Sequence, residues 1–414
     1  MTRLSRMAWR NLWRNRRRTV LTLVAIAFGL FLSILMTAMQ DRSFADMIDD
    51  AARLGSGHVT VSHPEYLEKP SLRKTLPDAG ALAAQAQQVD GVEHVAVRIS
   101  GSTMVATAEG SYGAFFVAFD PSEETLDSFY YLDSVVEGEM LKPDDTAGMV
   151  LGTRLAANLG AELGDKVVYR LMDKDGEITA GLGRVRGLAS AGSPSVDGAL
   201  VILHIDAVRD VLGYAPTEAT ELAVFTSDSR DSDVVAKRLQ LALGDDVAAA
   251  TWDTISPDLS GFVAMKVGGA RFMEAVIMIL VAAGIFNTLF VSVMERTREF
   301  GIMLAIGWSS GQIFRLVMWE SLWLALVGVL LGGAVTGPLY AYLVRNPIDL
   351  TEAMAGQAQI DVGGVGMSLL LRIGIFPENL AIILALVIGS TLLSGVYPAW
   401  KAGNTVPVDS IKLV

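Results

Sequence analysis

The chain has 414 residues, of which 51% are hydrophobic and 19% charged, and its mean hydropathy is +0.42. This composition is too apolar for a typical water-soluble protein of this length and too charged for one that lies wholly in a membrane, so it predicts a membrane protein with a large aqueous domain. Residues 40–270 carry 36 acidic against 18 basic side chains, which argues against a nucleic-acid partner, and the absence of cysteine excludes disulfides and thiolate chemistry.

The N-terminal segment, residues 1–18, contains seven arginines together with Trp9, Leu12 and Trp13. This mixture predicts a cytoplasmic amphipathic helix that lies along the inner leaflet of a membrane. Residues 19–39 follow without a charge and are long enough to cross the hydrocarbon core. A cleaved signal peptide is the alternative, but the apolar run is longer than a typical signal sequence and Thr37-Ala38-Met39 is a poor cleavage site.

The next region, residues 40–274, is predicted to be an extracytoplasmic α+β domain. Strand-like and helical stretches alternate, and Gly, Pro and Asp separate them. Its length suffices for one large or two small α+β units, and residues 110–122 are the expected seam in the second case. The predicted strands are 58–63, 93–100, 113–120, 165–171 and 199–204, and the predicted helices are 79–89, 153–159 and 232–243.

Three further uncharged stretches, 275–294, 321–344 and 380–397, complete four predicted membrane spans. The five arginines between Arg10 and Arg18 place the N-terminus in the cytoplasm, because basic residues flank the cytoplasmic ends of spans. Alternation then places 295–320 inside, 345–379 outside and the tail 398–414 inside. The absence of charge within the spans argues against an ion-coupled carrier.

Glycine spacing in the third span predicts close helix packing, because Gly328-x-x-x-Gly332 and Gly333-x-x-x-Gly337 place small residues on one helix face.

Several patterns resemble active sites but lack the partners that the chemistry needs. Gly307-Trp308-Ser309-Ser310-Gly311 matches the nucleophile elbow of hydrolases, but an apolar helix precedes it and all four histidines lie across the predicted membrane. A helix start with Ser309 as N-cap and Gln312 in a capping box is the better interpretation. Residues 160–166 resemble a phosphate loop without its Ser or Thr, and His58 and His63 have no third metal ligand nearby. We therefore expect no catalytic or metal site.

The most distinctive cytoplasmic element is the charged and apolar segment 294–307. Its apolar side chains are expected to lie on the membrane, while its charged end meets a soluble partner. The alternative is a solvated connecting turn held by pairs such as Glu295 with Arg298, although such pairs are weak. The apolar side chains concerned are Phe300, Ile302, Met303, Leu304 and Ile306.

Residues 294–307, Met-Glu-Arg-Thr-Arg-Glu-Phe-Gly-Ile-Met-Leu-Ala-Ile-Gly, resemble the E-R-x-x-E-I-G-x-x-x-A-x-G motif of ABC-transporter permeases of the FtsX, MacB and lipoprotein-releasing LolC/LolE type. Residues 394–402 are similar to the family's S-x-x-P-A-x-x-A ending, which Pro407 and Ile411 follow. Residues 137–165 resemble its outer-domain core, and the N-terminal Trp-Arg-Asn-Leu-Trp-Arg run is typical too. The resemblance covers nearly the whole chain and implies four spans with a large domain after the first.

The resemblance implies that residues 294–307 form a coupling helix in a groove of a separate cytoplasmic ABC ATPase. The chain itself would be non-catalytic and without a cofactor, because the ATPase dimer would bind ATP and Mg. A second permease chain, identical or a sister, would complete the unit, and ATP binding would move the outer domains. The implied ATPase-coupling residues are Glu295, Arg296, Arg298, Glu299, Gly301, Ala305 and Gly307.

Lipoprotein release is the first substrate hypothesis, with a periplasmic lipoprotein, chaperone or adaptor as a further partner. A MacB-like exporter that passes cargo to a tunnel protein, an FtsX-like regulator and a non-transporting membrane sensor are the alternatives. The implied acyl-chain contacts equally suit lipid-facing or dimer-packing surfaces. These residues are Phe31, Leu35, Met36 and Met39 in the first span, and Phe272, Val276 and Ile279 at the start of the second.

Overall fold

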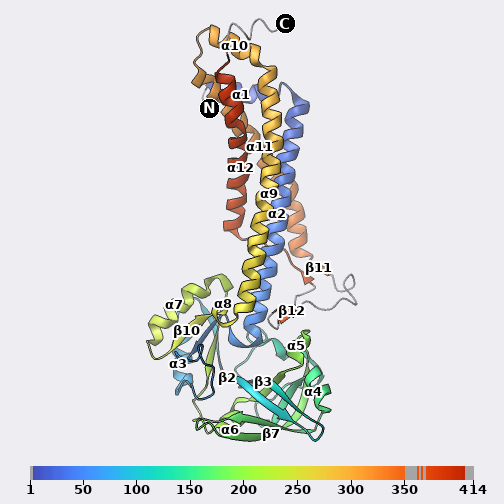
Figure 1. The fold of residues 1–414 in the computed structure, drawn as a ribbon, viewed down its shortest axis with the longest axis vertical. Coiled ribbons are helices and arrows are strands. Elements are labelled where there is room, and N and C mark those ends of the chain that lie inside the picture. Colours follow the sequence, from blue (N-terminus) through green and yellow to red (C-terminus); the bar gives the residue numbers. More distant parts are fainter. Residues whose placement is uncertain (1–2, 350–360, 363–364, 367–369, 406–414) are drawn as a thin grey trace. The chain divides into compact units, whose positions relative to one another are not determined.

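The computed structural model describes residues 3–349, 361–362, 365–366 and 370–405, so Pro407 and Ile411 lie outside the described residues. The chain forms two compact units, which are described separately (Figure 1). The helical unit comprises Met1–Ser43, Met265–Glu352 and Leu370–Val414. The β-rich unit comprises Phe44–Ala264 and Ala353–Leu369.

Among the described residues, four helices are long and apolar enough to cross a membrane. They are α2 (Arg16–Ala51, continued by the π-helical turn η1, Ala52–Ser56), α9 (Pro257–Glu295), α11 (Ser310–Arg345) and α12 (Pro377–Gly403). Each contains the predicted span and extends beyond it. The predicted fold class, four membrane helices with an α+β domain inserted after the first, is confirmed.

Glycine allows α11 to approach α2 closely within the helical unit. A Cβ added at Gly328 would lie 2.5 Å from Ile26 Cγ2, and one at Gly332 would lie 2.7 Å from Leu30 Cδ2. Among the residues that the structure describes, a Cβ added at Gly333 or at Gly337 would meet nothing within 4 Å. The close helix packing predicted from glycine spacing is therefore confirmed for the first pair, whereas no described helix of this chain packs against the second pair.

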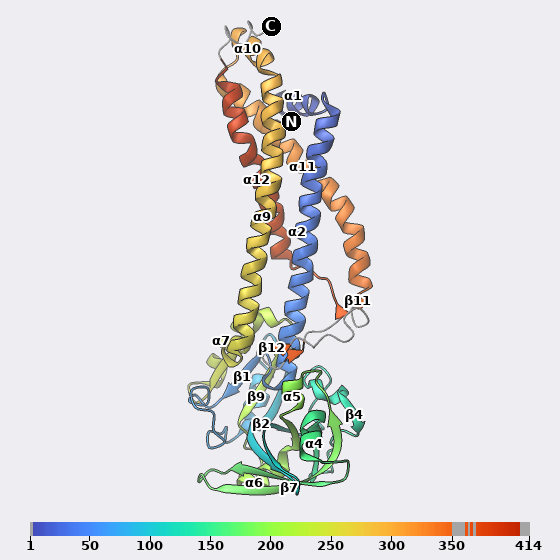
Figure 2. The same cartoon turned by 45° about the vertical axis from the view of Figure 1, so that its right-hand side comes forward.

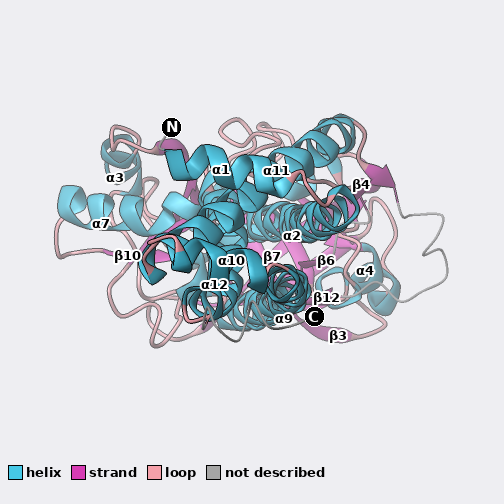
Figure 3. Ribbon diagram, turned by 90° about the horizontal axis from the view of Figure 1, so that it is seen from above, coloured by secondary structure: helices cyan, strands magenta, loops and turns pink. Residues whose placement is uncertain are grey.

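The first helix, α1 (Arg3–Leu12), packs across α11 rather than extending α2 (Figure 3). The ring centroids of Trp9 and Trp323 are 5.0 Å apart, and Trp323 Nε1 donates to the Ser5 carbonyl oxygen at 3.3 Å. Ala8 and Leu12 are buried, which gives this amphipathic segment an apolar face against its own helical unit.

A cap from a neighbouring helix fixes the start of α12. The Asp41 carboxylate on α2 accepts hydrogen bonds from Phe376 N at 3.0 Å and from Asn379 Nδ2 at 2.8 Å. Phe376 is the N-cap residue of α12 and has no side-chain cap of its own, so Asp41 satisfies a backbone donor that would otherwise be left at the helix end.

The β-rich unit is built on one ten-stranded mixed sheet in the order β10-β1-β9-β2-β3-β8-β5-β7-β4, with β6 paired to β2 and β7 (Figure 2). The pairs β3–β8 and β5–β7 are parallel and the remaining pairs are antiparallel. The strands are β1 (Val59–Ser62), β2 (Val92–Ala106), β3 (Ser111–Phe119), β4 (Val135–Gly138), β5 (Gly148–Gly152), β6 (Lys166–Met172), β7 (Ile178–Ala189), β8 (Leu200–His204), β9 (Glu221–Thr226) and β10 (Ala248–Thr251).

Short helices accompany this sheet, and small strand pairs lie between α11 and α12 in the chain. The helices are α3 (Ala79–Ala86), η2 (Tyr130–Asp133), α4 (Thr153–Leu159), α5 (Pro194–Asp197), α6 (Ile205–Leu212), η3 (Ser229–Asp231), α7 (Ser232–Leu243) and α8 (Trp252–Ile255). The later strands are β11 (Ile348–Asp349), β12 (Asp361–Val362), β13 (Val365–Gly366) and β14 (Leu370–Leu371).

The predicted seam at residues 110–122 is wrong, because β3 lies inside it and joins the two halves of the sheet. β3 pairs with β2 along its whole length and with β8 on its other edge. Residues 44–264 therefore form one unit rather than two.

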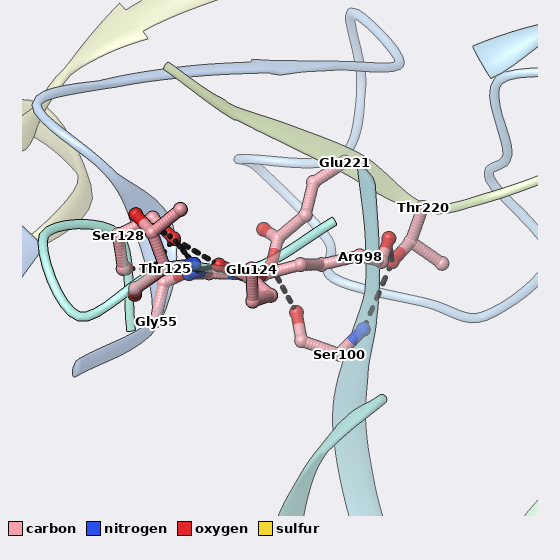
Figure 4. Close-up of polar contacts among 8 residues, drawn as sticks. All are labelled: Gly55, Arg98, Ser100, Glu124, Thr125, Ser128, Thr220 and Glu221. Carbon is pink, nitrogen blue, oxygen red and sulfur yellow. Dashed lines mark hydrogen bonds and ion pairs between the residues drawn. The ribbon is translucent and has the colours of Figure 1, made fainter. Parts of the chain in front are cut away.

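A buried arginine fastens η1 to this sheet (Figure 4). Arg98 on β2 is 0% exposed, and its Nε and Nη2 donate to the two Glu124 carboxylate oxygens at 2.7 and 2.9 Å. Its Nη1 donates to the carbonyl oxygen of Gly55, within η1. Nearby, the buried Glu221 carboxylate accepts a hydrogen bond from Ser100 Oγ at 2.7 Å. Arg98 thus links strand β2 both to Glu124, through the ion pair, and to η1, through the Gly55 carbonyl oxygen.

Candidate functional site: the coupling segment and its ionic anchor

Two local signals shape the segment between α9 and α11. Gly307 has φ +103°, a left-handed conformation that glycine adopts without strain, and it ends the short helix α10 (Thr297–Ala305). Ser309 then starts α11: its Oγ accepts from Gln312 N at 3.3 Å, and Gln312 Oε1 accepts from Ser309 N at 2.9 Å. The predicted capping box is confirmed, and the nucleophile-elbow alternative fails because helices lie on both sides of this turn.

One face of α10 is buried in the helical unit. Phe300 is 0% exposed and packs in a cluster with Val293, Ile313 and Ala399, and Met303 and Leu304 pack against the same cluster. Gly301 is also buried. The expectation that the apolar residues of this segment lie on the membrane is therefore wrong for Phe300, which anchors α10 to α9, α11 and α12.

Arg296, at the junction of α9 and α10, provides a buried ionic anchor. Its Nη1 donates to both carboxylate oxygens of Glu320 on α11, at 2.9 and 3.0 Å, and its Nε donates to Glu299 at 3.2 Å. Its guanidinium carbon lies 5.0 Å from the centroid of the Phe300 ring. Only 8% of Arg296 is exposed, so the anchor lies inside the unit.

Two further pairs bind this segment to the arginine-rich N-terminal turn. Arg18 Nη2 lies 2.5 Å from Glu295 Oε1, and Arg14 Nη2 lies 2.8 Å from Glu299 Oε1. The alternative in which Glu295 pairs with Arg298 is wrong, because Glu295 pairs with Arg18.

Electrostatics agree with this arrangement. Burial works against the charge of Arg296, but the Glu320 charge and the hydrogen bonds to Glu320 and Glu299 outweigh burial and raise the pKa of Arg296. Burial would raise the pKa of Glu299, yet hydrogen bonds from Arg14 and Arg296 lower the pKa overall. The hydrogen bond from Arg18 lowers the pKa of Glu295. All three groups are therefore charged at neutral pH.

The opposite face of α10 is exposed. Arg298, Ile302 and Ile306 follow one another at intervals of four residues, and Ala305 lies beside them. Ile302 is 46% and Ile306 71% exposed. Among the described residues, no hydrogen bond or ion pair involves the Arg298 side chain. Of the seven predicted coupling residues, Arg296 and Gly301 are buried, Glu299 is half-buried, and Glu295, Arg298, Ala305 and Gly307 are exposed.

The predicted acyl contacts lie on two neighbouring helices. A Cβ added at Gly29 on α2 would lie 2.6 Å from Val281 Cγ2 on α9, so these helices touch within the helical unit. Met36, Phe272 and Ile279 are exposed, and the others (Phe31, Leu35, Met39 and Val276) are half-buried. These side chains therefore contribute to the surface of the helical unit.

Sequence reasoning missed Glu320, Arg14 and Arg18 as partners of the coupling segment. The available signal was a single carboxylate, Glu320, directly before an apolar span, since an isolated charge there needs a partner.

Comparison with known proteins identifies the family. The model of the MacB-like periplasmic core domain matches residues 19–242, and that of the FtsX-like permease C-terminal domain matches residues 271–407. The chain belongs to the MacB/FtsX/LolC family of ABC-transporter permeases.

Curated relatives agree with this assignment. The pyoverdine export ATP-binding/permease protein PvdT of Pseudomonas putida is 26% identical over 84% of this chain and 53% of its own length. An ABC transporter permease of Methanocaldococcus jannaschii is 23% identical over 98% of this chain and 96% of its own. The lipoprotein-releasing system transmembrane protein LolC of Neisseria meningitidis is 25% identical over 95% and 94%. The chain thus spans about half the length of PvdT and nearly all of LolC.

Proposed function

We propose that this permease converts ATP binding and hydrolysis by a separate cytoplasmic ABC ATPase into movement of its extracytoplasmic domain. The observation that carries the proposal is the division of α10 into two faces. Phe300 and Arg296 hold one face inside the helical unit, while Arg298, Ile302 and Ile306 present a row of exposed side chains on the other. An apolar row exposed on a short, firmly anchored helix suits a protein partner.

In this proposal the predicted coupling residues have different roles. Of the predicted coupling residues, Arg298 and Ala305 contact the ATPase, together with the exposed Ile302 and Ile306. Arg296 and Gly301 are positioning residues, because they are buried within this chain.

The ion pairs of Glu295 and Glu299 carry the movement of α10 to the N-terminal turn through Arg18 and Arg14. In this proposal both termini lie in the cytoplasm, in agreement with the basic N-terminal segment. A second permease chain completes the transporter.

For the substrate, we propose a lipoprotein whose acyl chains contact α2 and α9. The similarity to LolC over nearly the full length of both chains supports this choice. Exposed Met36, Phe272 and Ile279 supply soft, apolar side chains that suit acyl chains. The similarity to PvdT favours export of a small molecule as the second candidate.

The test is a mild-detergent pull-down of the full chain from native membranes, followed by mass spectrometry. We expect the wild type to retain an ABC ATPase and Ile302→Asp to lose it. Leu241→Asp is the control, because it places the same charge on an exposed leucine of the β-rich unit, and it should retain the ATPase. A co-retained acylated protein supports lipoprotein release, and a co-retained tunnel or adaptor protein supports export. Absence of any ATPase contradicts the proposal.

A further inference from the structure

Helix α1 carries a row of exposed arginines on the side away from its buried residues. Arg3, Arg6 and Arg10 are exposed and follow one another at intervals of three and four residues, so they share one side of the helix. We call this row the arginine face of α1. The residues on the buried side recur at the same intervals and are Ser5, Ala8 and Leu12.

The arginine face has no negative charge of this chain to pair with. Residues 1–40 contain no Asp or Glu, and residues 294–345 contain three glutamates. Each of these glutamates already has a partner, in the pairs Arg18–Glu295, Arg14–Glu299 and Arg296–Glu320. Among the described residues, no hydrogen bond or ion pair involves the side chains of five exposed arginines, which are Arg3, Arg6, Arg10, Arg16 and Arg17. Five positive charges therefore remain for a partner outside the chain.

The position of α1 within the helical unit matches the surface of a membrane. Asn11 Nδ2 donates to Glu320 Oε1 at 2.9 Å, and Trp323 Nε1 donates to the Ser5 carbonyl oxygen at 3.3 Å. Glu320 is the last charged residue before the uncharged stretch 321–344 of α11. Helix α1 thus lies level with the start of a membrane-length apolar stretch, which is the depth of phospholipid headgroups.

Two tryptophans lie beside the arginine face. Trp9 is 36% and Trp13 39% exposed, and the Trp9 ring packs against the ring of Trp323. Tryptophan is enriched where a membrane meets water, because its ring is apolar and its N–H is polar. Arginine and tryptophan together on the exposed side of a helix at this depth favour a membrane surface over a soluble protein as the partner.

We infer that the arginine face of α1 binds the headgroups of anionic phospholipids. Guanidinium groups form charge-assisted hydrogen bonds with phosphate oxygens, and each basic side chain near an anionic surface adds to the attraction. A choline headgroup carries a positive charge that offsets its phosphate, so the face should prefer phosphatidylglycerol to phosphatidylcholine. The bound lipid holds α1 beside α11, and the inference does not depend on an ATPase.

The test uses the full chain, purified in detergent and depleted of lipid, and measures lipid binding by native mass spectrometry together with the thermal midpoint. The additions are phosphatidylglycerol and phosphatidylcholine with identical acyl chains, so that only the headgroup differs. We expect tighter binding of phosphatidylglycerol and a rise in the thermal midpoint that added salt reduces, because salt screens exposed charges. Equal binding of the two lipids by the wild type would overturn the inference.

Double variants locate the site. Arg6→Gln with Arg10→Gln removes two unpaired charges without breaking an ion pair, and it should weaken phosphatidylglycerol binding about tenfold or more. Binding of phosphatidylcholine, and the thermal midpoint without lipid, should stay as in the wild type. Arg6→Lys with Arg10→Lys keeps both charges and should retain most of the binding. Arg154→Gln with Arg170→Gln is the control, because it removes the same charge from two exposed arginines of the β-rich unit, and it should bind as the wild type does.

Three results would contradict the assignment. One is unchanged phosphatidylglycerol binding in the glutamine variant of Arg6 and Arg10, and another is an equal loss of binding in the control. The third concerns a soluble protein as the occupant of the arginine face. If the same glutamine variant loses the ABC ATPase in a pull-down from native membranes but binds phosphatidylglycerol as the wild type does, the face serves a protein rather than the membrane.

Discussion

The buried pair of Arg98 and Glu124 gives a sharp prediction about the β-rich unit. The variant Glu124→Gln keeps the size and one acceptor oxygen but removes the negative charge. Arg98 is fully buried, and two hydrogen bonds of 2.7 and 2.9 Å join it to Glu124. Removing one partner of a buried ion pair destabilises a protein by about 3–5 kcal/mol, because the other charge stays buried.

The structure places the expected loss at the lower end of this range. Carbonyl oxygens of Gly55 and Ser128 still accept from the guanidinium. We therefore expect a loss of about 3 kcal/mol, which corresponds to an increase of about 10²-fold in the opening equilibrium.

Hydrogen exchange of the full chain, followed by mass spectrometry, measures this effect. Peptides that cover β2 and η1 should exchange faster in Glu124→Gln, since both elements depend on Arg98. Glu139→Gln, which removes a fully exposed partner of Lys142, should leave exchange unchanged. Unchanged protection in Glu124→Gln, or an equal increase in Glu139→Gln, would refute the reasoning.

Three further predictions follow from single contacts. Burial raises the pKa of Glu221 despite the Ser100 hydrogen bond and the Arg98 charge, so the folded protein binds this proton more tightly than the unfolded chain does. Ionisation of Glu221 therefore destabilises the folded protein as the pH rises above the pKa that Glu221 has in the unfolded chain. Glu221→Gln should raise the thermal midpoint at pH 8 but not at pH 4. Equal shifts of the midpoint at both pH values would contradict this prediction. Gly332→Ala should destabilise the helical unit by about 1–3 kcal/mol, because the added methyl group would press against Leu30. Gly333→Ala is the control, because no described residue lies within 4 Å of the added methyl group. Thermal midpoints of the two variants and the wild type, measured in detergent, test the prediction, and equal midpoints would contradict it. Asp41→Ala removes the hydrogen-bond acceptor at the start of α12 and should destabilise this helix end by about 1 kcal/mol. Backbone amides around Phe376 should then exchange hydrogen faster. Unaltered exchange would show that the helix start does not depend on Asp41.

The sequence predicts the features that depend on neighbouring residues. Apolar runs locate all four long helices, and Ser309 with Gln312 predicts the capping box, because the donor and the acceptor lie three residues apart. Strand β6 and helix α4 are also recognised from local pattern and turn residues.

Features that join distant residues could not be predicted in this way. Arg18 and Glu295 are 277 positions apart, and Arg14 and Glu299 are 285 apart, so nothing local links them. For the same reason, the sequence suggested a seam where β3 instead pairs with strands on both edges. The burial of Phe300 also depends on residues of α11 and α12, which local periodicity does not place beside it.

The most direct test of the central claim, that the exposed face of α10 meets an ATPase, uses the absence of cysteine from this chain. Ile302→Cys and Phe300→Cys each introduce a single thiol, the first on the exposed face and the second on the buried face. After treatment of native membranes with a short thiol-to-amine crosslinker, Ile302→Cys should yield a covalent product with an ABC ATPase, and Phe300→Cys should not. No ATPase product from Ile302→Cys, in membranes where the ATPase is present, would contradict the account.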